Sequence, residues 1–208
     1  MKTVIKKIKG DWVEVLNNCR STINKEEINK EPSEKFKKEL LIAEHSPIRS
    51  IIFCWSWKGI ASWIATHFCR HKWECFISTR RTDRYGIPRS KLTQDTLVDF
   101  SGEANVQALI DTMRKRLCYQ AAKETREYAE DLKLAITEKD KDIGHVLVPN
   151  CIYRCGCPEM NKCGLIDEFK NWCKEKEIEF DWFDIKARYN VYDMFFSRKG
   201  RRNEDRNS

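Results

Sequence analysis

The pattern of apolar and polar positions divides the chain into short strands and helices. Runs rich in β-branched and aromatic residues predict strands over 2–9, 49–58, 73–79 and 178–184. Apolar residues at helical spacing predict helices after the capping residues Asp11 and Ser33, and over 60–72, 102–136 and 165–176. The pattern therefore predicts a chain that contains both strands and helices.

The strongest helical repeat runs over 102–136, where Val106, Ile110 and Met113 lie on one face. We therefore expect one long helix there. Gly59 is expected to end the strand predicted over 49–58. The polar stretches 80–91 and 137–144 are expected to be loops.

Composition is consistent with one folded domain. The 208 residues are 41% hydrophobic and include 7 Trp, 10 Phe and 6 Tyr, which suffices for a sizeable core. We expect a single domain over 1–196 and a basic, disordered tail over 197–208. The sequence has neither a run of about 18 apolar residues nor a signal-peptide pattern, so we expect a cytoplasmic protein with reduced cysteines that does not enter a membrane.

Positive charge is concentrated in one aromatic-rich segment. The formal net charge is +7, and residues 66–91 hold seven Lys or Arg against two acids. Trp73, Phe76 and Tyr85 are interleaved with these cations. Arginine binds phosphate and aromatic rings stack on bases, so the segment predicts an anion site for a nucleotide or a nucleic acid.

Common catalytic motifs do not account for this segment. The sequence has no dinucleotide-binding glycine fingerprint, no P-loop and no nucleophile elbow. His67 and His71 have the spacing of metal ligands on a helix, but the Glu of a zinc-protease motif is missing because Phe68 follows His67. We favour a polar or ligand-facing role for the two histidines over metal binding.

Four closely spaced cysteines are a second candidate feature. Cys151, Cys155, Cys157 and Cys163 could hold zinc, although the paired knuckles of common zinc sites are missing. The favoured interpretation is a tight loop with small buried thiols, so no metal is assigned.

Arg116 is the most informative single position in the predicted long helix. It falls beside the apolar face that Leu109 and Met113 define, so its guanidinium should be partly buried. Such a group needs an anionic partner. A substrate phosphate and a carboxylate such as Glu124 satisfy this need equally well.

Four motifs in order resemble the flavin-dependent thymidylate synthases, the ThyX family. The first is Glu44-His45-Ser46-Pro47 before a strand. The second and third are Arg70-His71-Lys72 and Thr82-Asp83-Arg84-Tyr85, which resemble the two ends of the family signature. The fourth begins at Asn105 and places Arg116, Ala121, Glu124 and Arg126 at the family's spacing.

The resemblance covers about two-thirds of the chain and implies a fold and a chemistry. The implied fold is α+β, with a central, mostly antiparallel sheet flanked by helices. The implied reaction converts dUMP to dTMP with methylenetetrahydrofolate, FAD and NADPH, in a homotetramer whose sites form where subunits meet. The implied FAD-binding residues are Ser46, Arg70, His71, Lys72, Asn105 and Gln107. The implied nucleotide-binding residues are His67, Thr82, Asp83, Arg84 and Arg116, with Arg116 also catalytic.

Departures from the family pattern leave two alternatives. Lys72 and Cys75 replace an Arg and a Ser of the signature, and His67 stands where the family has a Gln. The first alternative is therefore a flavin-dependent methylase or hydroxymethylase of another pyrimidine nucleotide. The second is a non-catalytic module that binds nucleic acid through Arg80, Arg81 and the tail, and nucleic acid is the less favoured partner.

Overall fold

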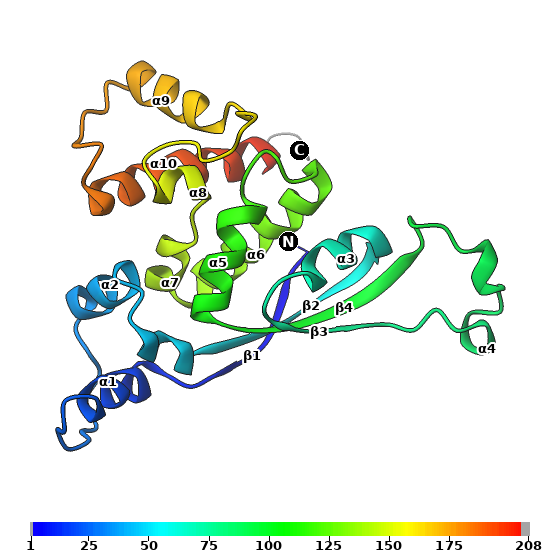
Figure 1. The fold of residues 1–208 in the computed structure, drawn as a ribbon, viewed down its shortest axis with the longest axis horizontal. Helices are drawn as coiled ribbons and strands as arrows, with labels where there is room; N and C mark the ends of the chain where they lie inside the picture. The colour runs from blue at the N-terminus through cyan, green and yellow to red at the C-terminus, as the bar shows by residue number, and fades with distance from the viewer. Residues whose placement is uncertain (1, 205–208) are drawn as a thin grey trace.

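Four antiparallel strands form one sheet in the order β1-β2-β4-β3 (Figure 1). This is a computed structural model, and it describes residues 2–204. The strands are β1 (Val4–Lys9), β2 (Ile52–Ala61), β3 (Glu74–Ile77) and β4 (Leu97–Asn105). The expected α+β fold with an antiparallel sheet is confirmed.

The sheet buries one face against helices. In β4, Val98, Phe100, Gly102 and Ala104 are buried, while residues 99, 101 and 103 between them are more exposed. The alternation matches the two-residue period of a half-buried strand. Phe100 stacks on Trp57 of β2, with ring centroids 4.9 Å apart. The core beside the site is therefore built largely from aromatic rings.

The helices gather mainly on one side of the sheet (Figure 1). The expected caps are present, because the side chains of Asp11 and Ser33 accept backbone N–H bonds at the starts of α1 and α2. The helices are α1 (Trp12–Ser21), α2 (Glu34–Ile42), α3 (Ser62–Cys69), α4 (Thr82–Tyr85), α5 (Val106–Arg116), α6 (Lys123–Lys139), α7 (Lys141–Val146), α8 (Asn150–Tyr153), α9 (Leu165–Glu175) and α10 (Ile185–Glu204). Two short 3-10 helices are η1 (Ser46–Ser50) and η2 (Arg89–Lys91).

The prediction of one continuous helix over 102–136 is wrong. Residues up to Asn105 complete β4, and the Asn105 side chain then caps α5 by accepting from the N–H of Ala108. The helix ends at Arg116, where Leu117 and Cys118 are buried and interrupt it. Pairing with β2 and packing of these two side chains override the local helical repeat.

Three smaller expectations also differ from the structure. Strand β2 continues past Gly59 to Ala61, with an irregular register that accommodates the glycine. The stretch 137–144 is largely helical, because α6 reaches Lys139 and Asp140 caps α7. The stretch 178–184 forms no strand and packs beside α9. The backbone carbonyl of Trp182 in this stretch accepts hydrogen bonds from the side chains of Cys155 and Arg188 and not from a neighbouring strand.

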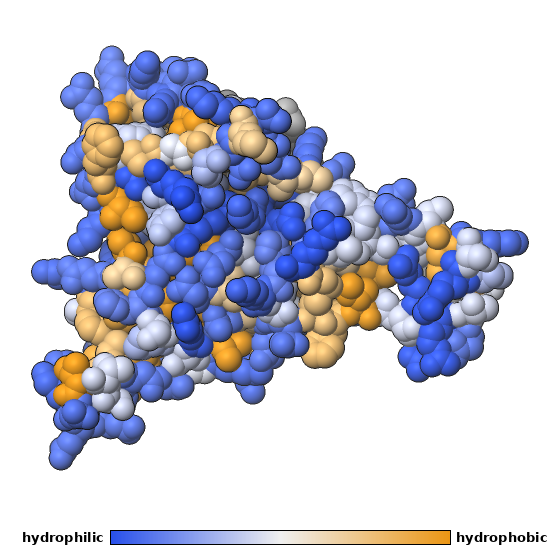
Figure 2. All heavy atoms as spheres, in the orientation of Figure 1, coloured by the Kyte–Doolittle hydropathy of each residue, from blue (hydrophilic) through white to orange (hydrophobic). Residues whose placement is uncertain are grey.

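Residues 78–96 form an arm that carries α4 away from the rest of the molecule (Figure 1). Its far end is mainly hydrophilic, whereas an apolar patch overlies β3, in which Phe76 is 68% exposed (Figure 2). At the other end of the chain, α10 runs to Glu204, so the described part of the basic tail is helical; residues 205–208 lie outside the described residues.

Within residues 2–204, the helices all lack the combination of length and apolar character that crossing a bilayer requires.

Candidate functional site

Arg116 lies at the end of α5 and is held by the end of α3 and by the segment that joins α3 to β3. Its Nε donates to Nε2 of His71 at 2.7 Å, and its Nη2 donates to the backbone carbonyl of His67 at 2.7 Å. Neither partner is a carboxylate, so these contacts leave the positive charge of Arg116 without a counter-charge. The expectation that Arg116 lies beside the buried face is confirmed, since it is half-buried.

The local electrostatic field is positive. Burial, followed by the charge of Arg70, lowers the pKa of the Arg116 guanidinium. Burial and then Arg116 lower the pKa of His71 to about 4, so His71 is neutral at pH 7 and Nε2 can accept the Arg116 bond. Two arginines beside a neutral imidazole favour the binding of an anion.

The His67 side chain is oriented by a contact with α6. Its Nδ1 lies 2.9 Å from Oγ1 of Thr125, a fully buried residue. Its ring also meets the edge of Trp63 at a centroid distance of 5.3 Å. Burial lowers the pKa of His67, with smaller contributions from Arg116 and Arg70. Thr125 was not among the predicted site residues, although it lies between two motif residues, Glu124 and Arg126.

A cavity of about 370 Å³ adjoins Arg116. Three of the six predicted FAD residues, namely His71, Lys72 and Asn105, line it. The remaining lining residues are Ile52, Trp73, Glu74, Glu103 and Ala104. Nζ of Lys9 lies 2.6 Å from Glu103, which balances the charge of that carboxylate. The lining thus includes a cation, an amide and an indole, which suit parts of a large polar cofactor, together with the exposed carboxylate of Glu74.

Gln107 and Ser46 lie near the start of α5. Gln107 donates through Nε2 to Glu44 at 2.7 Å, and Arg114 also pairs with Glu44. Ser46 begins η1, which packs against α5, and its side chain is exposed. Both residues therefore lie close to the end of β4 that carries Asn105, and the contacts of Glu44 with Gln107 and Arg114 were not predicted from the sequence.

The structure does not bring Thr82, Asp83 and Arg84 to Arg116. They form α4 on the arm, far from α5 in Figure 1, and all three are exposed. Asp83 pairs with Arg81 at 2.9 Å. Within one subunit the predicted nucleotide residues are therefore divided between two places. Arg70 is exposed beside Arg116 and remains close to the main site.

The four cysteines of the possible zinc site do not form a ligand set. Cys155 donates to the carbonyl of Trp182, while Sγ of Cys163 lies 3.8 Å from Sγ of Cys118. Across the described part of the chain, His, Cys, Asp and Glu side chains form no group of three or more suited to a metal ion. The geometry gives the zinc alternative no support.

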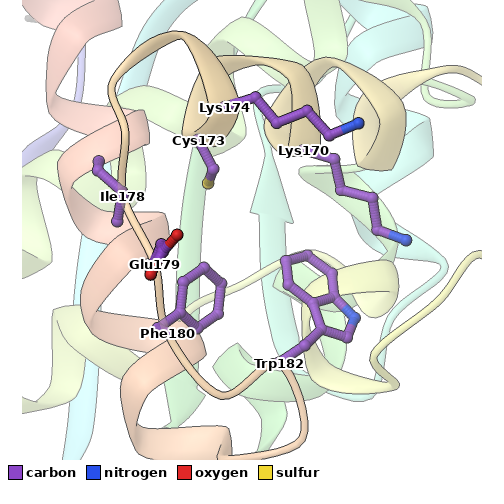
Figure 3. A pocket seen from close by; sticks show the side chains of 7 residues that line it. All are labelled: Lys170, Cys173, Lys174, Ile178, Glu179, Phe180 and Trp182. Atoms are coloured by element: carbon purple, nitrogen blue, oxygen red, sulfur yellow. The ribbon is translucent and has the colours of Figure 1, made fainter.

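A second cavity of about 490 Å³ lies between α9 and the segment that follows it (Figure 3). Lys170 and Lys174 face it from α9, and Phe180 and Trp182 face it from the following segment. It contains none of the predicted site residues. We therefore place the candidate site at Arg116 and the cavity beside it.

Comparison with solved structures identifies the class of fold. The chain matches structures of ThyX flavin-dependent thymidylate synthase from Helicobacter pylori complexed with FAD and dUMP. One of these structures gives a TM-score of 0.61 at 12% identity, and the match covers 71% of this chain and 99% of that chain. Another gives a TM-score of 0.57 at 11% identity, and the match covers 71% of this chain and 100% of that chain. This protein therefore has the fold of the flavin-dependent thymidylate synthases.

A further match has a different described activity. The UMP/dUMP methylase PolB from Streptomyces cacaoi, bound with 5-Br dUMP, gives a TM-score of 0.56 at 12% identity. The match covers 69% of this chain and 93% of PolB. No family model and no curated protein sequence matches the chain.

Proposed function

We propose that this protein is a flavin-dependent enzyme that methylates a pyrimidine nucleotide, and that its substrate is dUMP. The observation that carries the proposal is the meeting of Arg116, His67 and His71 beside a cavity lined by Lys72 and Asn105. The ThyX fold and the order of the motifs add independent support.

FAD fits the chemistry of this cavity in part. Lys72 can pair with a phosphate, Trp73 can contact a ring, and Asn105 can hydrogen-bond a polar edge. Arg70, Ser46 and Gln107 would hold the parts of FAD that extend beyond the cavity. When bound, FAD would supply the hydride, with NADPH as its reductant and methylenetetrahydrofolate as the one-carbon donor.

Arg116 would bind and polarise the pyrimidine ring. A guanidinium has five N–H groups, and the contacts to His71 and His67 use two of them. The others can donate to a ring carbonyl, where negative charge develops as the one-carbon unit is transferred. A fixed, partly buried cation stabilises that charge without reorganising. His67, held by Thr125, would contact the same nucleotide.

A second candidate substrate is another pyrimidine nucleotide. His67 occupies the position of a nucleotide-contacting Gln in the resembled family, and an imidazole offers a different pattern of donors and acceptors. A fold match to a methylase described as acting on both UMP and dUMP makes this alternative concrete.

Oligomerisation would complete the nucleotide site. Arg84 lies on the arm and is separated from Arg116 within one subunit. We propose that the arm of one subunit places Arg84 at the phosphate of a nucleotide bound by Arg116 of another, in a homotetramer. The exposed residues of β3 at the base of the arm would then lie near an interface.

The absorbance spectrum tests this proposal most directly. The purified protein should retain flavin bands through gel filtration after incubation with FAD, and the bands should shift when dUMP is added. Tritium release from C5-labelled dUMP, compared with labelled UMP and dCMP, would then identify the substrate. A protein that stays colourless at high FAD and binds nucleic acid in a salt-dependent way would contradict the enzyme proposal.

A further inference from the structure

Two cysteines enclose the loop that forms one wall of the site cavity. Cys69 is the last residue of α3 and Cys75 lies in β3, and their Sγ atoms are 2.6 Å apart. Both are free thiols in this structure. The cavity has eight lining residues, and four of them, 71–74, lie between the two cysteines.

We propose that Cys69 and Cys75 form a reversible disulfide that fixes this wall of the cavity. The disulfide itself requires only the contact between the two sulfurs; its effect on FAD rests on the proposed function. It closes a ring from Cys69 to Cys75 that holds Arg70, His71 and Lys72.

The loop has few backbone restraints of its own. The N–H of His71 bonds the carbonyl of Phe68, and the N–H of Trp73 bonds the carbonyl of His71. Arg70 and Lys72 are exposed. A covalent link across the loop removes conformations that would carry His71 away from Arg116, and such preorganisation strengthens ligand binding.

The chemistry is a thiol–disulfide exchange with a low-molecular-weight disulfide such as oxidised glutathione. Burial, followed by the hydrogen bond to the adjacent Cys75, raises the pKa of Cys69 to about 12. The thiolate of one cysteine of the pair attacks one glutathione sulfur and releases the other as a thiolate, which takes up a proton. The other cysteine then loses its proton and displaces the second glutathione. Two protein thiols and one glutathione disulfide give one protein disulfide and two glutathione thiols.

Among the ten cysteines, Cys118 and Cys163 provide the natural comparison. Their sulfurs lie 3.8 Å apart, and burial raises the pKa of Cys118 to about 11. This pair also contains a thiol whose pKa is raised by burial, but its sulfurs are more widely separated. We therefore expect the Cys69–Cys75 pair to oxidise at a more reducing glutathione ratio.

The test measures oxidation in the full-length protein. The protein is equilibrated across a series of reduced-to-oxidised glutathione ratios, quenched with acid and alkylated, and its peptides are analysed by mass spectrometry. The expected product is a peptide pair linked through Cys69 and Cys75, formed before Cys118 or Cys163 is consumed. If Cys69 and Cys75 stay free, or each carries glutathione, across the whole series, the proposal is overturned.

Local rigidity gives a readout that does not require FAD. Oxidation should slow tryptic cleavage after Arg70 and Lys72 by about two- to tenfold, because ring closure restricts the loop. Cys75→Ser should show the fast rate under all conditions, and the matched Cys118→Ser variant should behave like the wild type. Equal cleavage rates in the oxidised and reduced protein would overturn the claim that the disulfide fixes the wall.

FAD titration by fluorescence separates the two proposals. We expect the oxidised protein to bind FAD about two- to tenfold more tightly than the reduced protein. Equal affinity in both states overturns the effect on the cavity. If the disulfide forms and cleavage slows, but neither state binds FAD, the proposed function fails and the disulfide proposal stands.

Discussion

Arg116 is the residue on which the candidate site depends. Its guanidinium is supported by a neutral imidazole and a backbone carbonyl, so its charge is available to a ligand. Arg114, two residues earlier, pairs with Glu44 and stacks on Tyr153 at 3.6 Å. The contrast between a paired and an unpaired arginine in one helical turn distinguishes a structural role from a binding role.

Arg116→Ala should remove turnover and preserve the fold. Loss of a fixed donor to a developing charge costs about a hundred- to a thousandfold in kcat. Lys115→Ala is the matched control, because Lys115 is exposed in the same turn. Kinetics and circular dichroism of the two variants provide the measurement. Activity of Arg116→Ala within a few-fold of the wild type would show that our assignment of Arg116 is wrong.

His71 should make stability depend on pH. Burial and Arg116 hold its pKa at about 4 in the folded state, below about 6.5 in the unfolded chain. Its contribution to the free energy of unfolding is therefore fully present above about pH 6.5 and is lost as the pH falls towards 4. The full difference corresponds to roughly 3 kcal/mol, and partial exposure reduces it to about 1–2 kcal/mol.

Urea unfolding at pH 7 and at pH 4.5 measures this effect. Since glutamine does not titrate, His71→Gln should lose less stability than the wild type between these pH values. Curves for the two proteins that shift equally with pH would rule out His71 as the source.

Sequence reasoning at this scale found what local motifs encode. Arg116, His67, His71, Lys72 and Asn105 lie together as the motifs predicted, within or beside one site. Thr125 was missed because its contact with His67 requires α6 to pack on α3, 58 residues away in the chain. No local pattern identifies the partner of a side chain at that separation.

At the scale of elements, strand β4 shows where periodicity fails. The repeat from Val106 onward predicts a helix correctly, but the residues before Asn105 follow a two-residue period set by pairing with β2. The prediction of a helix from residue 102 merged the strand pattern before Asn105 with the helical pattern after it, and Asn105 is the residue that caps the helix. The later break at Leu117 depends on burial in the tertiary structure, which the sequence pattern does not show.

Gly102 is the position in β4 most sensitive to added volume. A Cβ there would lie 2.3 Å from Cζ2 of Trp55, which is 1% exposed. Gly102→Ala should lower the free energy of unfolding by about 1–3 kcal/mol, because the indole must move within a packed core. Gly156→Ala is the control, since a Cβ there meets nothing within 4 Å.

Chemical denaturation of both glycine variants checks this prediction. The Gly102 variant should unfold at a lower urea concentration than the wild type, and the Gly156 variant should match the wild type within about 0.5 kcal/mol. Wild-type stability in Gly102→Ala would mean that Trp55 has room to shift.

At the scale of the whole molecule, the arm separates two sets of predicted nucleotide residues. Arg116 lies in the body and Arg84 on the arm, and both are assigned to one nucleotide. If the sites form between subunits, each site takes Arg116 from one subunit and Arg84 from another. Arg84→Ala and Arg116→Ala then each remove only one of these two residues from a site. Mixing two inactive variants should then produce some sites with both residues intact.

Subunit mixing therefore tests whether the site is shared. Each variant alone should have little activity, and an equal mixture that has exchanged subunits should recover about a quarter of the wild-type activity, because each site draws two contributors at random. A mixture of Arg116→Ala and Arg116→Gln is the matched control. No site in it contains Arg116, so this mixture should recover no activity. If the Arg84 mixture also stays inactive after confirmed exchange, Arg84 and Arg116 act within one subunit, and the arm must fold back to reach the body.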